Sequence, residues 1–262
     1  PALNGVWAMH IHLTGRLSRA KSAEGIKKTP TMMIRPFTKR VGLRLAGAAT
    51  ALLFLATVIQ AQTDGMVAWW NFDNDNFADS IGIYDGEEQG TLPIQFVPSK
   101  TGFGNAISLD GEDQEILIVG GEPDDLAFAG GTMSVAGWFR VTAFDTDWQA
   151  LIAKGEGTNW RVHRRGATDN LTSALGLGEP AQGGFSVNDG AWHHFVATSD
   201  PADLMSLYID GELAEQTTAA PTLTANGQRV MIGENPDAQG REWEGELDDL
   251  AIWDRVLTPG EV

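Results

Sequence analysis

The sequence predicts an all-β fold from residue 66 onward, as a two-sheet antiparallel β-sandwich. Short apolar segments rich in aromatic and β-branched residues recur along this part of the chain, and clusters of Gly, Asp, Asn and Pro separate them. No long stretch has the 3.6-residue periodicity of a helix. A succession of about a dozen short strands with turn signals between them is typical of β-sandwiches.

Each expected strand is bounded by turn residues. In chain order the expected strands are Met66–Phe72, Ala106–Leu109, Glu115–Val119, Met133–Val141, Ala150–Ala153, Trp160–His163, Leu171–Leu177, Trp192–Thr198, Met205–Ile209, Arg229–Ile232 and Glu246–Trp253. The clearest example is Ala191–Leu213, in which an aromatic strand, a polar turn and an alternating strand are followed by Asp210-Gly211. An Asp-Gly pair between alternating segments is a strong hairpin signal.

Charge divides the chain into two parts. Residues 1–61 contain nine Lys and Arg and one acid, whereas residues 62–262 contain nine Lys and Arg and 34 acids, which gives about +8 and about −25. The acidic part will repel nucleic acid and anionic lipid, so neither is an expected partner. Its acids are expected either to form a well-solvated surface or to gather in part around calcium.

The basic N-terminal part predicts export. Residues 33–61 combine four basic residues, the uncharged apolar run Leu45–Ile59 and the small residue Ala61, which together predict a signal peptide. An uncleaved signal anchor is the alternative. Residues 1–32 are expected to be a non-structured upstream extension, and residues 62–262 the folded domain. After cleavage we expect a secreted or cell-surface protein that is free of the membrane.

Cysteine is absent, which excludes disulfides, zinc–thiolate sites and cysteine nucleophiles. A domain of this size can bury enough surface without disulfides, so their absence is compatible with secretion.

Five segments in order resemble the LamG-like jelly-roll domain of the concanavalin A-like lectin/glucanase superfamily. They are Val67–Asp73, Gly104–Gly111, Met133–Phe139, Ala191–Leu213 and Gly245–Glu261, the last of which is also similar to a pentraxin segment. The resemblance implies a concanavalin A-like jelly roll. It implies function only weakly, because one fold hosts many activities.

The resemblance leads us to expect a secreted, non-catalytic module that binds carbohydrate or another extracellular ligand. A structural or adhesion module of a larger, multidomain surface protein is one alternative. A degenerate or accessory domain of a glycoside hydrolase is the other.

The resemblance also implies a structural calcium ion, with Asp79 in the loop after the first strand and Asp248 on the closing strand as ligands. A weaker second site is expected at Asp237, in a segment similar to a pentraxin calcium loop in which Asn235 replaces a Glu. Carboxylates and backbone carbonyls are the ligands that calcium prefers. The alternative for these acids is the capping of turns.

A catalytic site is not expected. Glu244, Glu246 and Asp248 are expected to share one strand face, as in the E-x-D-x-x-E motif of jelly-roll glucanases, but Ala251 stands where the last Glu would be. Glycoside hydrolysis needs two carboxylates, and here the acid/base partner is missing.

The remaining candidate residues are a pair of histidines and the tryptophans. His193 and His194 are adjacent on a strand and therefore point to opposite faces, so the pair is expected to be structural rather than a metal or general-base site. Most strand tryptophans are expected in the core. Trp148 and Trp160, next to predicted loops, are the candidates for ligand contact.

Overall fold

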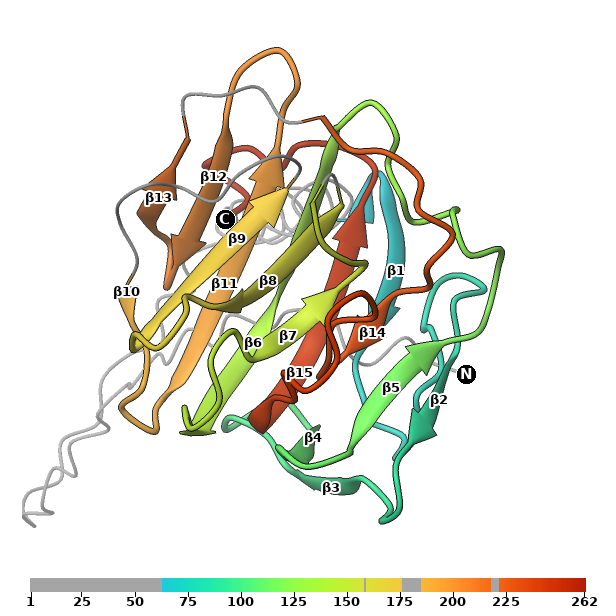
Figure 1. Ribbon diagram of the computed structural model, residues 1–262, viewed down its shortest axis with the longest axis vertical. Helices are drawn as coiled ribbons and strands as arrows, with labels where there is room; N and C mark the ends of the chain where they lie inside the picture. The colour runs from blue at the N-terminus through green and yellow to red at the C-terminus, as the bar shows by residue number, and fades with distance from the viewer. Residues whose placement is uncertain (1–62, 158, 176–184, 218–221) are drawn as a thin grey trace, which may run out of the picture. The chain divides into compact units, whose positions relative to one another are not determined.

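The described residues form two antiparallel β-sheets packed face to face (Figure 1). The computed structural model describes residues 63–262 except 158, 176–184 and 218–221. The chain divides into two units, Pro1–Thr63 and Asp64–Val262, and both sheets belong to the second. The expected extension and signal peptide therefore lie outside the described residues. Within those residues, no helix is both long and apolar enough to span a membrane.

Sheet A contains eight strands and is built around its two longest. In spatial order they are β13 (Glu212–Gln216), β12 (Met205–Ile209), β11 (Trp192–Ser199), β6 (Met133–Ala143), β15 (Glu244–Trp253), β4 (Asn105–Asp110) and β3 (Gln95–Pro98), with β1 (Met66–Trp70) also paired to β15. In this register Trp138 of β6 lies opposite both His194 of β11 and Asp248 of β15.

Sheet B contains seven strands. In spatial order they are β10 (Phe185–Ser186), β9 (Asn170–Leu175), β8 (Trp160–Arg164), β7 (Ala150–Ala153), β14 (Met231–Ile232), β5 (Glu115–Ile118) and β2 (Gly86–Gln89). The predicted fold class, an antiparallel two-sheet sandwich, is thus confirmed.

All eleven expected strands are present, with shifts of a few residues at their ends. The strands that the sequence pattern did not predict are β13, β3, β10 and β2, which are the two outermost strands of each sheet path. An outermost strand has a neighbour on one side only and can be polar. The segment Gly86–Gln89, for example, contains no apolar side chain.

The core lies between the two sheets. Alternating residues of each strand point into it, as the period-2 geometry of strands requires. Its largest side chains are fully buried aromatics, Trp70, Trp160, Trp243, Phe139 and Phe195. Aromatic residues bury the most apolar area per residue, which accounts for a stable core without disulfides.

A second, smaller apolar cluster covers the outer face of sheet A. It contains Ala136, Val196, Ala251, Trp253 and Leu257, with Trp69 partly buried against them. Ser134 joins the chain after β15 to this face, because its Oγ donates to Arg255 O at 2.8 Å and accepts from Leu257 N at 2.9 Å. The outer face of sheet A therefore has its own packing, and Asp248 belongs to the same face.

Candidate functional site

Asp248 lies in the middle of the outer face of sheet A and has no exposed surface. Its Oδ2 accepts a hydrogen bond from Ser99 Oγ, and its Oδ1 accepts one from the backbone N of Asp249 at 2.7 Å. Burial, followed by repulsion from the Asp249 carboxylate, raises the pKa of Asp248 to about 8.

Asp249 is a second carboxyl group beside Asp248 and is partly buried. Its backbone is left-handed, with φ of 49°, at an irregularity in the pairing of β15 with β6. The indole Nε1 of Trp69 donates to Asp249 Oδ1 at 3.0 Å. Burial raises the pKa of Asp249 to about 7, although the hydrogen bond from Trp69 acts in the opposite direction. Asp248 and Asp249 thus form a carboxyl pair in which charge is disfavoured.

Asp79 has different hydrogen-bond partners from Asp248. Its carboxylate accepts three backbone N–H groups, from Trp69 at 2.9 Å, Ile81 at 3.1 Å and Tyr84 at 3.1 Å. These bonds hold the loop after β1 against the strand. These contacts are those of the turn-capping alternative for Asp79, whereas its ligation of calcium together with Asp248 stays a prediction.

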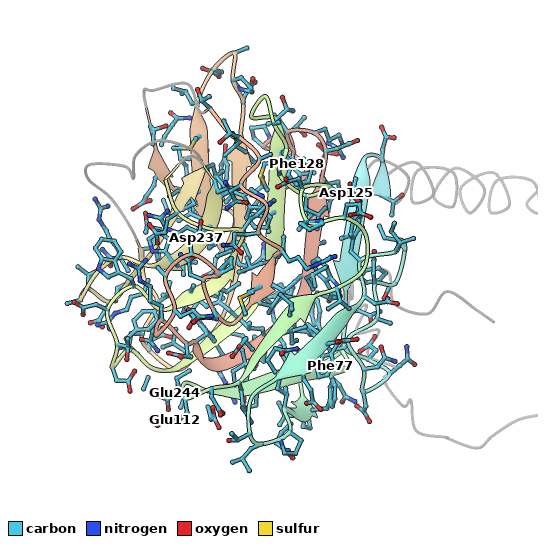
Figure 2. All side chains as sticks on the ribbon, turned by 45° about the vertical axis from the view of Figure 1, so that its right-hand side comes forward. Phe77, Glu112, Asp125, Phe128, Asp237 and Glu244 are labelled. Carbon is cyan, nitrogen blue, oxygen red and sulfur yellow. The ribbon has the colours of Figure 1, made fainter. Side chains whose placement is uncertain are left out.

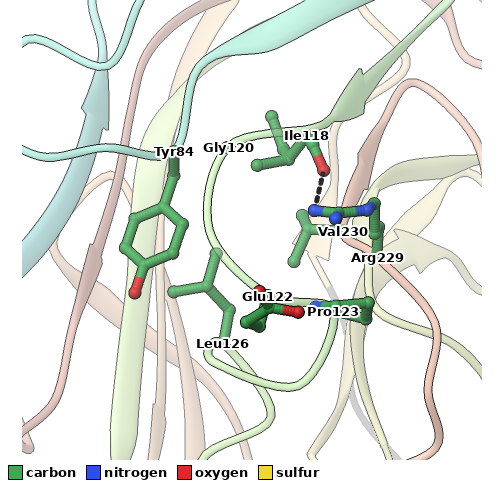
Figure 3. A pocket seen from close by; sticks show the side chains of 8 residues that line it. All are labelled: Tyr84, Ile118, Gly120, Glu122, Pro123, Leu126, Arg229 and Val230. Carbon is green, nitrogen blue, oxygen red and sulfur yellow. Dashed lines mark hydrogen bonds between the residues drawn. The ribbon is translucent and has the colours of Figure 1, made fainter.

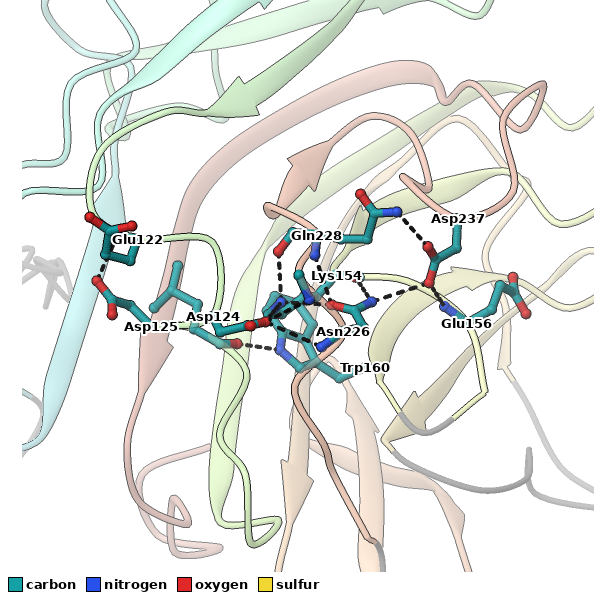
Figure 4. Close-up of polar contacts among 11 residues, drawn as sticks. Glu122, Asp124, Asp125, Lys154, Glu156, Trp160, Asn226, Gln228 and Asp237 are labelled. Atoms are coloured by element: carbon teal, nitrogen blue, oxygen red, sulfur yellow. Dashed lines mark hydrogen bonds and ion pairs between the residues drawn. The ribbon is translucent and has the colours of Figure 1, made fainter.

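Asp237 lies in the loop between β14 and β15, where its two oxygens accept hydrogen bonds from three other residues (Figure 4). The donors are Glu156 N at 3.1 Å, Asn226 Nδ2 at 3.1 Å and Gln228 Nε2 at 2.8 Å. The neighbouring cation is the buried ammonium of Lys154. The expected calcium loop at Asp237 is therefore already held together by the chain's own donors.

A ready-made metal centre is missing from the described residues, in which no three His, Asp or Glu side chains are arranged to hold an ion. Among the three predicted ligands, Asp248 has no exposed surface, and its surroundings raise its pKa to about 8. A divalent cation would offset the cost of its charge, so Asp248 fits the chemistry of a calcium ligand better than Asp79 or Asp237.

The two histidines point to opposite faces, as predicted. The His193 ring packs against Phe139 of the core, with 5.7 Å between ring centroids, whereas the His194 ring packs 4.9 Å from Trp138 on the outer face. His193 also lies between the carboxylates of Asp210 and Asp189, at 2.8 Å and 3.1 Å. Burial lowers the pKa of His194 to about 4, so this ring is neutral at physiological pH.

Trp160 is part of the core, and this corrects the expectation of ligand contact. Its ring has no exposed surface, and Nε1 donates to Leu126 O at 2.8 Å. The strand alternation that places Trp160 inside was readable in the sequence. Its position next to a loop was the misleading signal.

Trp148, by contrast, lies half-buried in the loop between β6 and β7. Its φ of 67° places a bulky residue in the left-handed region, which is a genuine outlier. The indole packs over Gly166 and lies 5.7 Å from the His163 ring, between centroids. Strained backbone of this kind persists only where the surroundings hold it, and it concentrates at binding sites.

Polar groups border the Trp148 ring. The Arg241 guanidinium carbon lies 6.0 Å from the ring centroid. Arg241 is paired with Glu156, which also lies 3.3 Å from Arg161 and accepts from Asn235 Nδ2 at 2.8 Å. An aromatic surface with fixed charged groups beside it is an arrangement suited to a polar ligand with one apolar face. The sequence pattern did not identify Arg241 or Glu156, because they come from loops distant in the chain.

The three acids of the closing strand are not equivalent. Glu246 is paired with Arg140, and Asp248 is bonded to Ser99. Glu244 lies beyond a shift in pairing register and close to Glu112 (Figure 2). Burial raises the pKa of Glu244, followed by the charges of Asp145, Asp110 and Glu112. Glu246 is thus paired with Arg140, and the register shift after Glu244 sets this residue apart from the rest of the strand.

A small pocket lies between the start of β2 and the loop after β5 (Figure 3). Its lining includes Tyr84, Glu122 and Arg229. Arg229 in its wall uses Nη1 to bind the carbonyls of Ile118, Val119 and Gly121 at 3.0–3.3 Å. Arg229 thus holds the end of β5 and the following loop in place and forms part of the wall of this pocket.

A family model described as the concanavalin A-like lectin/glucanases superfamily matches residues 110–262. In sequence, the chain is 34% identical over 86 residues to the sushi, von Willebrand factor type A, EGF and pentraxin domain-containing protein 1 of Rattus norvegicus. It is 37% identical over 87 residues to neuronal pentraxin-1 of Homo sapiens. These stretches are 29% and 30% of this chain but 2% and 20% of the two relatives.

Solved structures share the fold. Domain 4 of AbnA, a GH43 extracellular arabinanase from Geobacillus stearothermophilus in complex with arabinotriose, has a TM-score of 0.58 at 19% identity, covering 75% of this chain and 95% of that one. The receptor binding domain of botulinum neurotoxin C/D mosaic serotype has a TM-score of 0.57 at 14% identity, covering 76% and 50%. At these identities the likeness extends to the fold alone.

Proposed function

Because the chain belongs to the concanavalin A-like lectin/glucanases superfamily, we propose that residues 62–262 form a secreted, non-catalytic binding module for carbohydrate or another extracellular ligand. The observation that carries the proposal is Trp148, a half-buried indole in a left-handed loop position with Arg241 beside its ring. Export rests on the signal-like segment 33–61.

A sugar is the ligand that suits this surface best. An indole face can pack against the apolar face of a sugar ring, while neighbouring charged groups bond its hydroxyls. The guanidinium of Arg241 can donate to hydroxyls, and the carboxylate of Glu156 can accept from them. The arabinotriose complex of the AbnA domain supports the choice, since it joins the same fold to a sugar.

The proposed lack of catalysis rests on the acids of β15. Glu246 is held by Arg140, and the position of a further motif acid is occupied by the buried Ala251. A hydrolase of this type needs two carboxylates about 5–10 Å apart on either side of the scissile bond.

A glycan array probed with the wild-type chain and with Trp148→Ala tests the proposal. Binding that Trp148→Ala loses supports it. The absence of binding to any glycan would favour a structural or adhesion module of a larger protein. Hydrolysis of a β-glucan that Glu246→Gln abolishes would replace the binding module by a glycoside hydrolase.

We further propose that calcium, where it binds this domain, is held at Asp248. The support is chemical: Asp248 is a buried carboxyl group whose charging is further disfavoured by the neighbouring Asp249, and a divalent cation would offset that cost. Melting temperatures in calcium and in chelator test this. We expect calcium to raise the melting temperature of the wild type by several degrees and to leave Asp248→Asn unchanged. An equal shift in both proteins would refute the assignment.

A further inference from the structure

Lys154 is a fully buried lysine at the end of β7, with 0% of its surface exposed. Its Nζ donates to Asp124 Oδ1 at 3.2 Å, Asn226 Oδ1 at 2.9 Å and Gln228 O at 2.7 Å (Figure 4). A lysine ammonium has three N–H donors, so each of them has a partner. A buried lysine is tolerated only when it is paired in this way.

The three acceptors around Nζ are a carboxylate, a side-chain amide and a backbone carbonyl. These are the oxygen types that coordinate calcium in proteins. They come from two loops distant in sequence, one between β5 and β6 and one before β14, and they meet at the end of β7. The surroundings of the ammonium thus have the donor chemistry of a cation site, with a positive charge already at its centre.

Further hydrogen bonds fix these acceptors in place. Asp124 Oδ1 also accepts the backbone N–H groups of Asn226 at 3.2 Å and Gly227 at 2.9 Å. Asn226 Nδ2 donates to Lys154 O at 3.0 Å and to Asp237 Oδ2 at 3.1 Å. Asp237 therefore joins the cluster through an amide that is oriented by its contact with Lys154.

Two carboxylates act on the single ammonium. Burial lowers the pKa of Lys154, and the carboxylates of Asp124 and Asp237 act in the opposite direction. Removing the ammonium would leave two carboxylates close together, with amide and carbonyl oxygens facing an unfilled space.

We propose that the ammonium of Lys154 is the resident cation of this loop cluster, so that the cluster assembles without a metal ion and becomes a divalent-cation site only when the ammonium is removed. The proposal does not depend on the ligand of the domain. The proposal replaces the second calcium site that the sequence suggested at Asp237, because the ammonium of Lys154 already offsets the carboxylate charge there.

The test compares two variants of the full chain that both lose the charge. Lys154→Ala leaves room for a hydrated cation, whereas Lys154→Met fills the space with an apolar chain of similar length. We expect both to melt below the wild type. We expect calcium at millimolar concentration to raise the melting temperature of Lys154→Ala by several degrees more than that of the wild type or Lys154→Met.

Terbium luminescence, excited through tryptophan, gives an independent readout with the metal alone. We expect it to show one additional bound ion in Lys154→Ala compared with the wild type and Lys154→Met. Equal calcium shifts and equal terbium binding in all three proteins would overturn the proposal.

A second variant keeps the proposal testable if Lys154→Ala does not fold. Asp237→Asn, in the presence of the native lysine, is expected to respond to calcium as the wild type does. A calcium response present in the wild type and lost in Asp237→Asn would show that a metal ion binds beside the ammonium, and would refute the proposal. The Asp248 assignment is judged separately, because it concerns the calcium response of Asp248→Asn.

Discussion

Asp210 Oδ2 lies 2.8 Å from His193 Nδ1, and this contact ties the turn between β12 and β13 to the neighbouring strand β11. The other oxygen of Asp210 accepts the backbone N–H of His194 at 2.9 Å. The two histidines and the Asp-Gly turn, which are prominent in the sequence, are thus parts of one structural unit. The contacts of Asp210 with both histidines therefore help to hold the strands of sheet A in register.

Asp210→Ala is expected to lower the free energy of unfolding by about 1 kcal/mol, because it removes the part-buried contact with the His193 ring and the exposed hydrogen bond from the backbone N–H of His194. Asp210→Asn should cost less, since Asn also tolerates the φ of 52° at this position and retains one acceptor oxygen. Urea unfolding of the three proteins measures the difference. Equal stability of Asp210→Ala and the wild type would show that the contact does not contribute to the free energy of unfolding.

Two tryptophan variants should behave in opposite ways. Trp160→Ala is expected to cost about 3–5 kcal/mol of stability, because it removes a fully buried ring from the core. Trp148→Ala should cost much less and should reduce ligand affinity. Denaturant unfolding and glycan binding of the pair separate the two roles. If Trp148→Ala retained full affinity, the ligand would bind at a different surface.

Stability is expected to fall as the pH rises from about 4 to about 8. The pKa values of Asp248 and Asp249 are raised to about 8 and about 7 from an ordinary value of 3.8, so the folded state retains protons that the unfolded chain has released. The stabilisation is fully present below the unfolded pKa of 3.8, falls as the pH rises above it, and is lost once the pH has passed about 7 for Asp249 and about 8 for Asp248, at about 1.4 kcal/mol per pH unit for each group at most.

Asp248→Asn should flatten this pH dependence, as measured by urea unfolding at several pH values. Glu115→Gln is a matched control, because the pKa of Glu115 on sheet B is raised to about 7, mainly by burial. It should also reduce the slope, but without changing any response to calcium. A slope in Asp248→Asn equal to that of the wild type would contradict the assignment.

The central strands were predictable, and the outermost strands were not. Segments such as Met133–Val141 carry apolar side chains on a face that must be buried, and this produces a visible pattern. Gly86–Gln89 and Glu212–Gln216 become strands because a neighbour offers backbone hydrogen bonds, which the sequence does not encode locally.

Sequence-based prediction of the candidate site is limited in the same way. Asp248 and Trp148 were identifiable as single residues, whereas Lys154 was not, because its partners Asp124 and Asn226 are 30 and 72 residues away. The available signal was a lysine that directly follows the apolar strand Ala150–Ala153. Such a residue is either exposed at the strand end or buried with partners, and sequence alone does not distinguish these two cases.

Two glycines in the loop between β3 and β4 provide a stability test with an internal control. Both have positive φ, 93° at Gly102 and 75° at Gly104. A Cβ at Gly104 would lie 1.7 Å from Asp73 Oδ1, whereas one at Gly102 would meet no atom within 4 Å. Gly102→Ala should cost about 1 kcal/mol from backbone strain alone, and Gly104→Ala clearly more. Thermal unfolding of both variants checks the order.

β15 is the last strand in sequence, yet it lies in the middle of sheet A and pairs with β1, β4 and β6. During synthesis, sheet A therefore stays incomplete until the ribosome has released residues 244–253, which join β1 and the β3–β4 pair to β6. Such long-range pairing slows folding.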